Sequence, residues 1–247
     1  MEALTAIAAS GMRSRTETLD LLANNIANAA TPGFKEDGES YNLFFGDSAW
    51  QGVNENRPAN PEMPLIQKNW VNFAQGTISE TGNASDLALT TPGFFVVQSA
   101  DGTPLYTRSG HFRISSTGVL QTQEGYQVQG TDGKPVQLDP AKTFTVSSSG
   151  QISQANVAVA NIQVVNVDSL ENLIKHGGPY FALAPSGKTA PAANTEVVQG
   201  KLEQANVEPT HSAVKLVGVL RQFEMMQRAI RIASEMGKEA VEQVAKI

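Results

Sequence analysis

One stretch of the sequence approaches a phosphate-binding loop. Residues 182–189 read Ala-Leu-Ala-Pro-Ser-Gly-Lys-Thr, which resembles the Gly-x-x-x-x-Gly-Lys-Ser/Thr motif whose backbone N–H groups cradle phosphates. Ala182 replaces the first glycine of that motif, and Pro191 interrupts the helix whose N-terminus would hold the anion. We therefore expect a loop between strands here, and no nucleotide site.

Other residue types that carry chemistry are scattered along the chain. His111, His176 and His211 are far apart in the sequence, and none has a second histidine or a glutamate at ligand spacing. The run 109–111 reads Ser-Gly-His but lacks the surroundings of a nucleophile elbow. The absence of cysteine excludes disulfides, thiolate metal sites and thiol catalysis. We expect neither an enzyme nor a bound cofactor or metal.

The composition narrows the class of protein further. A chain of 247 residues with 40% apolar residues is long enough for one large or two small domains with a real core. Its net charge of −6 gives no general basic character for binding nucleic acid or anionic lipid. The sequence has no apolar run of about 18 residues, so we expect no membrane insertion. Its first residues lack the basic region of a cleavable signal peptide.

The element with the most distinctive sequence lies near the start of the chain, at 19–35. Leu19, Leu22 and Ile26 follow at spacings of three and four, so they share one face of a helix. Pro32 ends this helix, and Gly33 permits a turn that other residues would resist. The stretch therefore predicts a helix followed by an abrupt stop.

Three asparagines occupy the last turns of this predicted helix. Asn24, Asn25 and Asn28 are mediocre helix formers because their amides compete for backbone hydrogen bonds. A surface helix with a proline–glycine stop would explain the pattern without any functional role. Alternatively, the amides make directed hydrogen bonds to another protein surface, as in a packed helical assembly.

The stretch 19–35 resembles the N-terminal signature of the flagellar basal-body rod and hook protein family. In that family, a helix ends in Asn-Asn-x-x-Asn and is followed by a Thr-x-Gly-Phe-Lys turn, as it is here. Similarity to family motifs is also found at 75–83, 86–89, 93–97, 106–112, 118–122, Gly125 and 203–207. The resemblance covers most of the chain, and the stretch 36–75 is covered least.

The two ends of the chain are predicted to be helical, over 2–30 and 206–247. Both carry an apolar stripe, and the C-terminal stripe follows heptad spacing with one three-residue slip at 223–226. No other part of the sequence has a stripe to match them. We therefore expect the terminal helices to pair as a coiled-coil-like assembly module, made of 1–35 and 206–247, with a β domain inserted between them.

The region between the helices divides into two parts. Residues 36–75 contain many glycines and prolines and predict an extended connector without long elements. Residues 76–205 show short runs of period two between frequent turns, which indicate an antiparallel barrel or sandwich. Within it, 168–177 predicts one short helix. The expected fold class is α+β.

The resemblance implies a structural subunit of the hollow, periplasm-spanning flagellar rod, exported unfolded by the flagellar type III apparatus. Its partners would be other rod subunits, further copies of itself and the export apparatus. The length of the chain and the run Phe-Glu-Met-Met-Gln-Arg-Ala-Ile at 223–230 favour the proximal-rod type. The alternatives are a distal-rod subunit, or a β-domain binding protein or enzyme with dimerising helices.

The resemblance also suggests which residues form the assembly interface. We expect apolar packing residues and directional asparagines from both terminal helices. They are Leu19, Leu22, Asn24, Asn25, Ile26, Asn28, Leu216, Leu220, Phe223, Met226 and Ile230.

Overall fold

The structure is a computed structural model that describes residues 2–44, 63–192 and 194–244. The chain forms two compact units. The helical unit consists of Met1–Ala27, Asp37–Val71 and Glu208–Ile247, and the β unit consists of Asn28–Glu36 and Asn72–Val207. Each unit is therefore assembled from segments that are far apart in the sequence.

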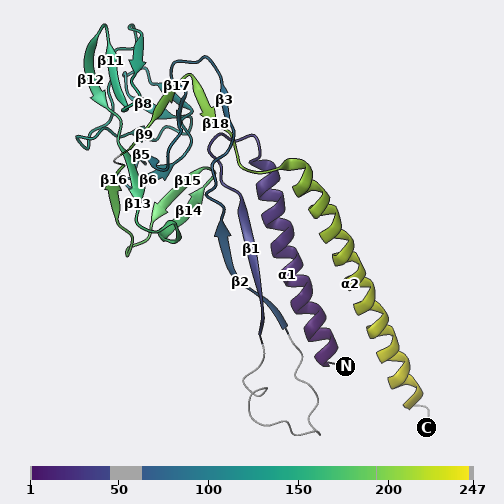
Figure 1. Cartoon of the computed structure of the whole chain (residues 1–247). Coiled ribbons are helices and arrows are strands. Elements are labelled where there is room, and N and C mark those ends of the chain that lie inside the picture. Colours follow the sequence, from purple (N-terminus) through teal and green to yellow (C-terminus); the bar gives the residue numbers. More distant parts are fainter. Residues whose placement is uncertain (1, 45–62, 193, 245–247) are drawn as a thin grey trace. The chain divides into compact units, whose positions relative to one another are not determined.

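Two long helices dominate the helical unit. α1 spans Glu2–Ala27, and α2 spans Pro209–Val244. They lie side by side and antiparallel, with the N-terminus of α1 and the C-terminus of α2 at the same end (Figure 1). Pro209 is the first residue of α2, a position where its missing N–H costs nothing and its fixed φ suits the helix.

The helical unit also contains an antiparallel pair of strands, β1 (Asp37–Phe44) and β2 (Met63–Val71). Trp70 lies against Gly38, where an added Cβ would come 2.4 Å from the indole ring, so a larger residue would not fit. The strands differ from the irregular connector expected at 36–75. Most of the glycines and prolines behind that expectation fall in 45–62, outside the described residues.

A sharp turn begins the β unit after α1. Gly33 adopts a φ of 71°, and a Cβ at this position would lie 2.2 Å from the backbone nitrogen of Ser109. Only glycine relieves both the conformational strain and the clash. The stop predicted at Pro32 and Gly33 is therefore confirmed, although α1 itself ends at Ala27, slightly earlier than expected.

Short antiparallel strands make up the rest of the β unit. They are β3 (Ile78–Glu80), β4 (Leu87–Leu89), β5 (Phe94–Gln98), β6 (Pro104–Thr107), β7 (Phe112–Ile114), β8 (Leu120–Thr122), β9 (Gln127–Val128), β10 (Phe144–Val146), β11 (Gln151–Gln154), β12 (Val157–Asn161), β13 (Val164–Val167), β14 (Leu173–Gly177), β15 (Tyr180–Leu183), β16 (Thr189–Pro191), β17 (Val197–Gln199) and β18 (Lys201–Glu203). The largest sheet has the order β14-β15-β6-β5-β9-β8-β7, and β13 joins it through β5 and also pairs with β16. The remaining strands form the sheet β10-β11-β12 and the pairs β17-β4 and β18-β3.

One apolar core holds these strands together. Phe95 and Phe112 meet edge to face, with ring centroids 5.3 Å apart. Around them lie Leu87, Leu89, Val97, Leu105, Leu120, Val128, Val136, Leu138, Phe144, Ile152, Ile162, Val164, Tyr180 and Val197. Each large buried side chain contributes about 1.5–3 kcal/mol, so this core provides most of the stability of the β unit.

The short helix expected at 168–177 is wrong. A single 3-10 turn, η2 (Leu170–Asn172), is followed directly by strand β14, which pairs with β15. Leu173 is buried and Ile174 is exposed, an alternation typical of a strand. A short helix is marginal without a packing partner, whereas β15 supplies backbone hydrogen bonds along its whole edge.

The α+β class is confirmed, with a helix near each end of the chain and a mostly antiparallel β region between them. Among the described residues, no helix has both the length and the apolar content needed to span a membrane.

Candidate assembly surfaces

The side of α1 that lies against its neighbours is built mostly from small and polar residues. Gly11, Ser14, Thr18, Leu22 and Asn25 are buried and follow one another at spacings of three and four. The sulfur of Met226 in α2 would lie 3.5 Å from a Cβ placed on Gly11. Small side chains let the two helices approach closely, because the side chains at a contact set the distance between helix axes.

The apolar residues predicted at the interface from α1 do not all share this buried side. Leu22 is buried, whereas Leu19 and Ile26 are half-buried. Leu22 therefore packs within the helical unit, and the other two lie at its margin.

The three asparagines of α1 and the turn after it have different surroundings. Asn25 is buried, and its amide holds the backbone of Asp37 with two hydrogen bonds. Its Nδ2 donates to Asp37 O (2.8 Å), and its Oδ1 accepts from Asp37 N (2.9 Å). Asn24 is exposed, and Asn28 is half-buried with its Oδ1 accepting from Thr31 Oγ1 (3.4 Å). The amide of Asn25 thus fixes the start of β1 within its own chain.

The interface residues predicted from α2 lie mainly on one side of that helix. Leu216, Phe223, Met226 and Ile230 are half-buried, on the side where Met226 contacts α1. The structure therefore brings these four residues against the rest of the same helical unit. Leu220 stands apart from them, with 43% of its surface exposed.

A second apolar stripe runs along the opposite side of α2, and sequence reasoning missed it. Its large members are exposed: Val214, Val217, Met225, Ile232 and Met236. We call this set the outer stripe. Its signal in the sequence is an 11-residue spacing, since Val214, Met225 and Met236 follow one another at intervals of 11 residues. The heptad pattern of the inner side is the more regular of the two and masks it.

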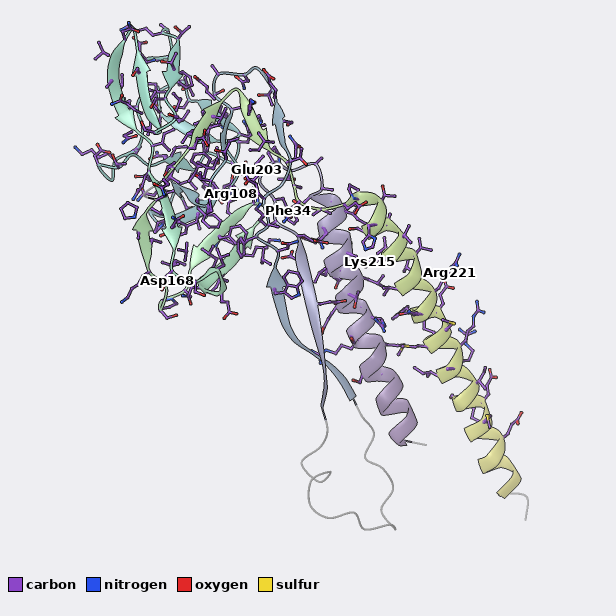
Figure 2. The ribbon with its side chains drawn as sticks, in the orientation of Figure 1. Phe34, Arg108, Asp168, Glu203, Lys215 and Arg221 are labelled. Atoms are coloured by element: carbon purple, nitrogen blue, oxygen red, sulfur yellow. The ribbon has the colours of Figure 1, made fainter. Side chains whose placement is uncertain are left out.

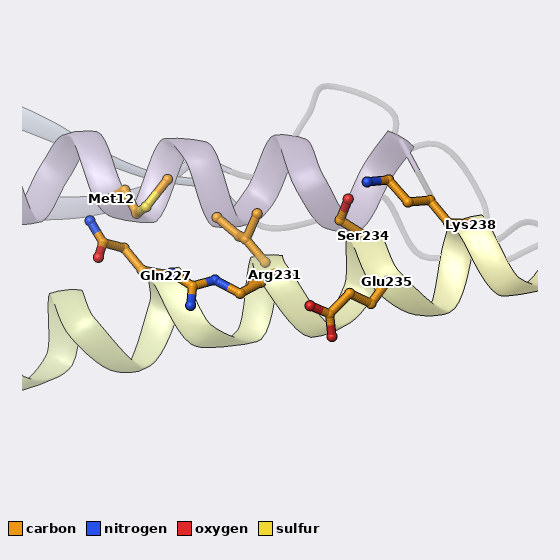
Figure 3. A pocket seen from close by; sticks show the side chains of 7 residues that line it. Met12, Gln227, Arg231, Ser234, Glu235 and Lys238 are labelled. Atoms are coloured by element: carbon orange, nitrogen blue, oxygen red, sulfur yellow. The ribbon is translucent and has the colours of Figure 1, made fainter.

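A groove opens between α1 and α2 toward the C-terminal half of α2. It has a volume of about 560 Å³. Met12 and Ile230 give it apolar walls. Polar and charged side chains line the rest: Gln227, Arg231, Ser234, Glu235 and Lys238 (Figure 3). A groove with apolar lining residues is a kind of surface that can receive the apolar face of a helix.

The β unit contains a buried ionic cluster that the sequence analysis did not predict. Glu203 is fully buried and accepts from Lys35 Nζ at 2.5 Å through Oε1 and from Arg108 Nε at 3.0 Å through Oε2. Lys35 also donates to Ala74 O (2.7 Å), and Arg108 Nη1 donates to the carbonyl of Gly93 (2.7 Å). Figure 2 marks Arg108 and Glu203 close together among the crowded side chains of this unit. Every charge in the cluster therefore has a partner inside the chain.

Burial and pairing act in opposite directions on this cluster. Burial lowers the pKa of the Lys35 ammonium, while the hydrogen bond and charge of Glu203 oppose that shift. Burial likewise lowers the pKa of the Arg108 guanidinium against the same carboxylate. Removing Glu203 would therefore leave two buried cations uncompensated. The available sequence signal was that each of these three charged residues lies within a motif similar to those of the rod and hook family.

Backbone contacts around the cluster hold together three segments that are remote in sequence. Gly33 N donates to Glu203 O (2.7 Å), and Glu36 N donates to Asn206 Oδ1 (2.7 Å). Asn206 Nδ2 in turn donates to Asn72 O (2.7 Å). The cluster and these bonds join residues 33–36, 72–76 and 203–206 inside the β unit.

The chemistry sought in the sequence does not converge in the structure. Residues 184–188 join strands β15 and β16, so the phosphate-loop-like stretch is the inter-strand loop that was expected. His111 Nδ1 pairs with Asp86 Oδ1 at 2.8 Å. Within the described ranges, no group of three or more His, Cys, Asp or Glu side chains is placed to hold a metal ion.

Comparison with known proteins relates these surfaces to a family. Three family models match the sequence: "Flagella basal body rod protein" over 6–35, "Flagellar hook protein FlgE/F/G D1 domain" over 88–154, and "Flagellar basal body rod FlgEFG protein C-terminal" over 198–242. The flagellar basal-body rod protein FlgF of Caulobacter vibrioides is 33% identical over 238 residues, which cover 93% of this chain and 92% of the relative. The chain belongs to the flagellar basal-body rod protein family.

Other rod proteins are similar over almost their whole length. FlgF of Mesorhizobium japonicum is 28% identical over 95% of both chains, and FlgG of Agrobacterium fabrum is 31% identical over 94% of this chain and 95% of its own. The resemblance inferred from the sequence motifs is thus confirmed. The three segments that match rod-family models contribute one residue each to the ionic cluster, namely Lys35, Arg108 and Glu203.

Proposed function

We propose that this chain is a structural subunit of the flagellar basal-body rod that joins its neighbours through its helical unit. Membership of the rod family supports this function. The observation that carries the proposal is the outer stripe of α2, where large apolar side chains such as Met225 and Ile232 are left 60% and 56% exposed in a single chain. Exposed apolar rows of this kind mark surfaces that are buried on association.

The terminal helices are the proposed assembly module. The antiparallel arrangement of α1 and α2 and the small residues between them support a coiled-coil-like pairing within each subunit. In this proposal Leu19, Ile26 and Leu220, at the margin of that pairing, and Asn24 and Asn28 contact neighbouring subunits. The domain division proposed from the sequence is revised in two ways: β1 and β2 are grouped with the helices, and residues 28–36 and 72–75 are grouped with the β unit.

The partners we propose are other rod subunits and further copies of this chain, with the flagellar export apparatus acting before assembly. We place the helices on the inside of a hollow rod and the β unit on its outside, in the periplasm-spanning part of the basal body. A structural role, not a catalytic one, agrees with the family and with the dispersed histidines. The proximal part of the rod is our choice, and a distal position is the alternative because both FlgF and FlgG proteins are similar to this chain.

The proposal is tested by purifying basal bodies from cells that produce the full chain with a small epitope tag. We expect the tagged chain in the rod fraction, and we expect cells lacking the gene to assemble neither hook nor filament. Immunogold labelling of isolated rods then separates a proximal from a distal position. Basal bodies free of the tagged chain, in cells that make it and swim, would refute the function.

A further inference from the structure

The outer stripe of α2 follows an 11-residue repeat. Val214, Met225 and Met236 are separated by 11 residues each, and they are 69%, 60% and 64% exposed. A repeat of 11 residues corresponds to about 3.67 residues per turn, close to the 3.6 of an undistorted helix. The stripe therefore runs nearly straight along the helix for six turns, a suitable shape for lying against another straight helix.

A glycine in this stripe faces open space among the described residues. Gly218 lies between Val214 and Arg221 on the same side, and a Cβ added to it would meet no atom within 4 Å. Glycine in the interior of a helix is destabilising because it loses the most conformational freedom on folding. Since no neighbouring atom of the described residues requires glycine there, we take close approach of another molecule as the reason for its presence. Ala229, 11 residues later, is also small.

The groove beside α1 is on a different side of the same helix. Met12 and Ile230 are its apolar lining residues, and the charged side chains of Arg231, Glu235 and Lys238 also line it (Figure 3). The outer stripe is bordered by exposed charges of both signs as well, with Arg228 and Glu239 next to it. The outer stripe and the groove therefore both combine apolar residues with charges of both signs. They lie on different sides of the helical unit, so they cannot contact each other within one chain.

We propose that the outer stripe of one copy of this chain lies in the groove between α1 and α2 of the next copy. This inference rests on the proposed function and deepens it by naming the two surfaces that meet. A stripe pairing with an identical stripe would form a closed dimer, whereas a stripe entering a groove repeats the same step at every added copy. Such an interface is heterologous and open-ended, as growth of a rod requires. The occupant of the groove is therefore a second copy of this chain.

Because the chain has no cysteine, disulfide cross-linking tests this interface directly. One variant carries Ile232→Cys in the stripe, a second carries Ser234→Cys in the groove, and a third carries both. Each is produced at native level as the tagged full chain, and basal bodies are oxidised and separated without reductant. The matched control pairs Ile232→Cys with Gln222→Cys, which lies on the same helix outside the groove.

The expected result is a ladder of covalent multimers from the variant with both cysteines, and at most traces of dimer from each single variant and from the control. Three results would overturn the inference while leaving the proposed function intact: efficient dimers from Ile232→Cys alone, no ladder in basal bodies that contain the variant, or a cross-link to a different rod protein identified by mass spectrometry. Absence of the wild-type chain from basal bodies would instead overturn the proposed function, and the inference with it.

Gly218→Ala provides a second test that does not depend on cross-linking geometry. Alanine favours a helix interior, so the purified chain should melt at the same or a higher temperature than wild type. If a second copy approaches closely at Gly218, incorporation into basal bodies should nevertheless fall several-fold. Wild-type incorporation of a chain with raised thermal stability would show that no molecule approaches the stripe at this point.

Discussion

The β unit buries four charged side chains, whereas the described part of α2 leaves six large apolar side chains exposed. In the β unit, Glu203 meets both Lys35 and Arg108, and each charge has a partner from the same chain. In α2, residues such as Met225 and Met236 have no such cover. The difference indicates that one copy of the chain pairs the buried charges of its β unit, whereas apolar surface of its helical unit remains exposed to solvent.

This contrast has a simple energetic meaning. A large apolar side chain gains about 1.5–3 kcal/mol when it leaves water, and the outer stripe gains this only when something covers it. The ionic cluster, in contrast, costs energy to bury and is tolerated because its charges are paired. Changes in the β unit should therefore act on folding, and changes in the outer part of α2 should act on assembly.

The largest effect is expected from Glu203→Ala. Removing this carboxylate leaves Lys35 and Arg108 buried without a counter-charge, which should lower the free energy of unfolding of the β unit by about 3–5 kcal/mol. Urea unfolding followed by circular dichroism measures the loss. Glu196→Ala is the matched control, because Glu196 is exposed and its carboxylate accepts a hydrogen bond from Thr90, at the surface. Equal losses in the two variants would show that the cluster does not stabilise the fold.

A smaller effect is expected from Asn25→Ala in the helical unit. The change leaves the backbone N–H and C=O of Asp37 without the amide that now bonds both, and should cost about 1–3 kcal/mol. Hydrogen exchange of the β1 and β2 amides measures the loosening. Asn24→Ala, next along the helix and exposed, should loosen these strands much less. Similar exchange rates in both variants would contradict the structural role of Asn25.

A further effect is expected from the pH, because the free energy of unfolding of the β unit should fall gradually at alkaline pH. Tyr180 donates a hydrogen bond to Glu124, and burial raises its pKa above the ordinary value of 10.0. The unfolded chain releases the phenol proton near pH 10 while the folded chain keeps it. The stability contributed by this group is therefore fully present below pH 10 and is lost as the pH rises above it, by at most about 1.4 kcal/mol per pH unit.

Tyr180→Phe isolates this slope. Burial lowers the pKa of Lys35, so that group makes stability rise with pH at the alkaline end, but it is present in both chains. Urea unfolding of the two chains below and above pH 10 should show a steeper alkaline loss in wild type. Parallel curves would mean that Tyr180 titrates alike in both states.

The smallest effect on folding is expected from Leu220→Asp. Leu220 is already 43% exposed, so unfolding of the β unit should change by no more than about 0.5 kcal/mol, while incorporation into basal bodies is blocked. Gln222→Asp places the same charge two residues away and serves as the control. If Leu220→Asp is incorporated at the wild-type level, this residue does not belong to the assembly surface.

Local patterns were enough to predict part of this molecule. The period of Leu19, Leu22 and Ile26 and the stop at Pro32 defined the first helix, and frequent turns defined the antiparallel strands. The spacing of apolar residues depends only on residues that are close in the sequence, so it predicts helices and strands well. It failed at 168–177, where the edge of β15 and not the local sequence decides the conformation.

The features that were missed depend on contacts between distant residues. Lys35 and Glu203 pair across the whole β unit, and neither has a local pattern that points to the other. The outer stripe was hidden for a different reason, because α2 has two apolar sides and the inner one matches the familiar heptad. A long helix with an apolar stripe on each of two opposite sides is the signal to search for in such sequences.

The pairing of Lys35 with Glu203 also has a temporal consequence. These residues are 168 positions apart, so their contact closes one of the longest loops in the chain. Contacts of such long range are slow to form because the entropy of loop closure is lost before the contact is gained. Because synthesis begins at the N-terminus, Lys35 and Arg108 are made long before Glu203. Nearly the whole of the β unit has to be made before their ionic contacts can form. The cluster can therefore be completed only after the chain has been made as far as Glu203, shortly before α2 begins at Pro209.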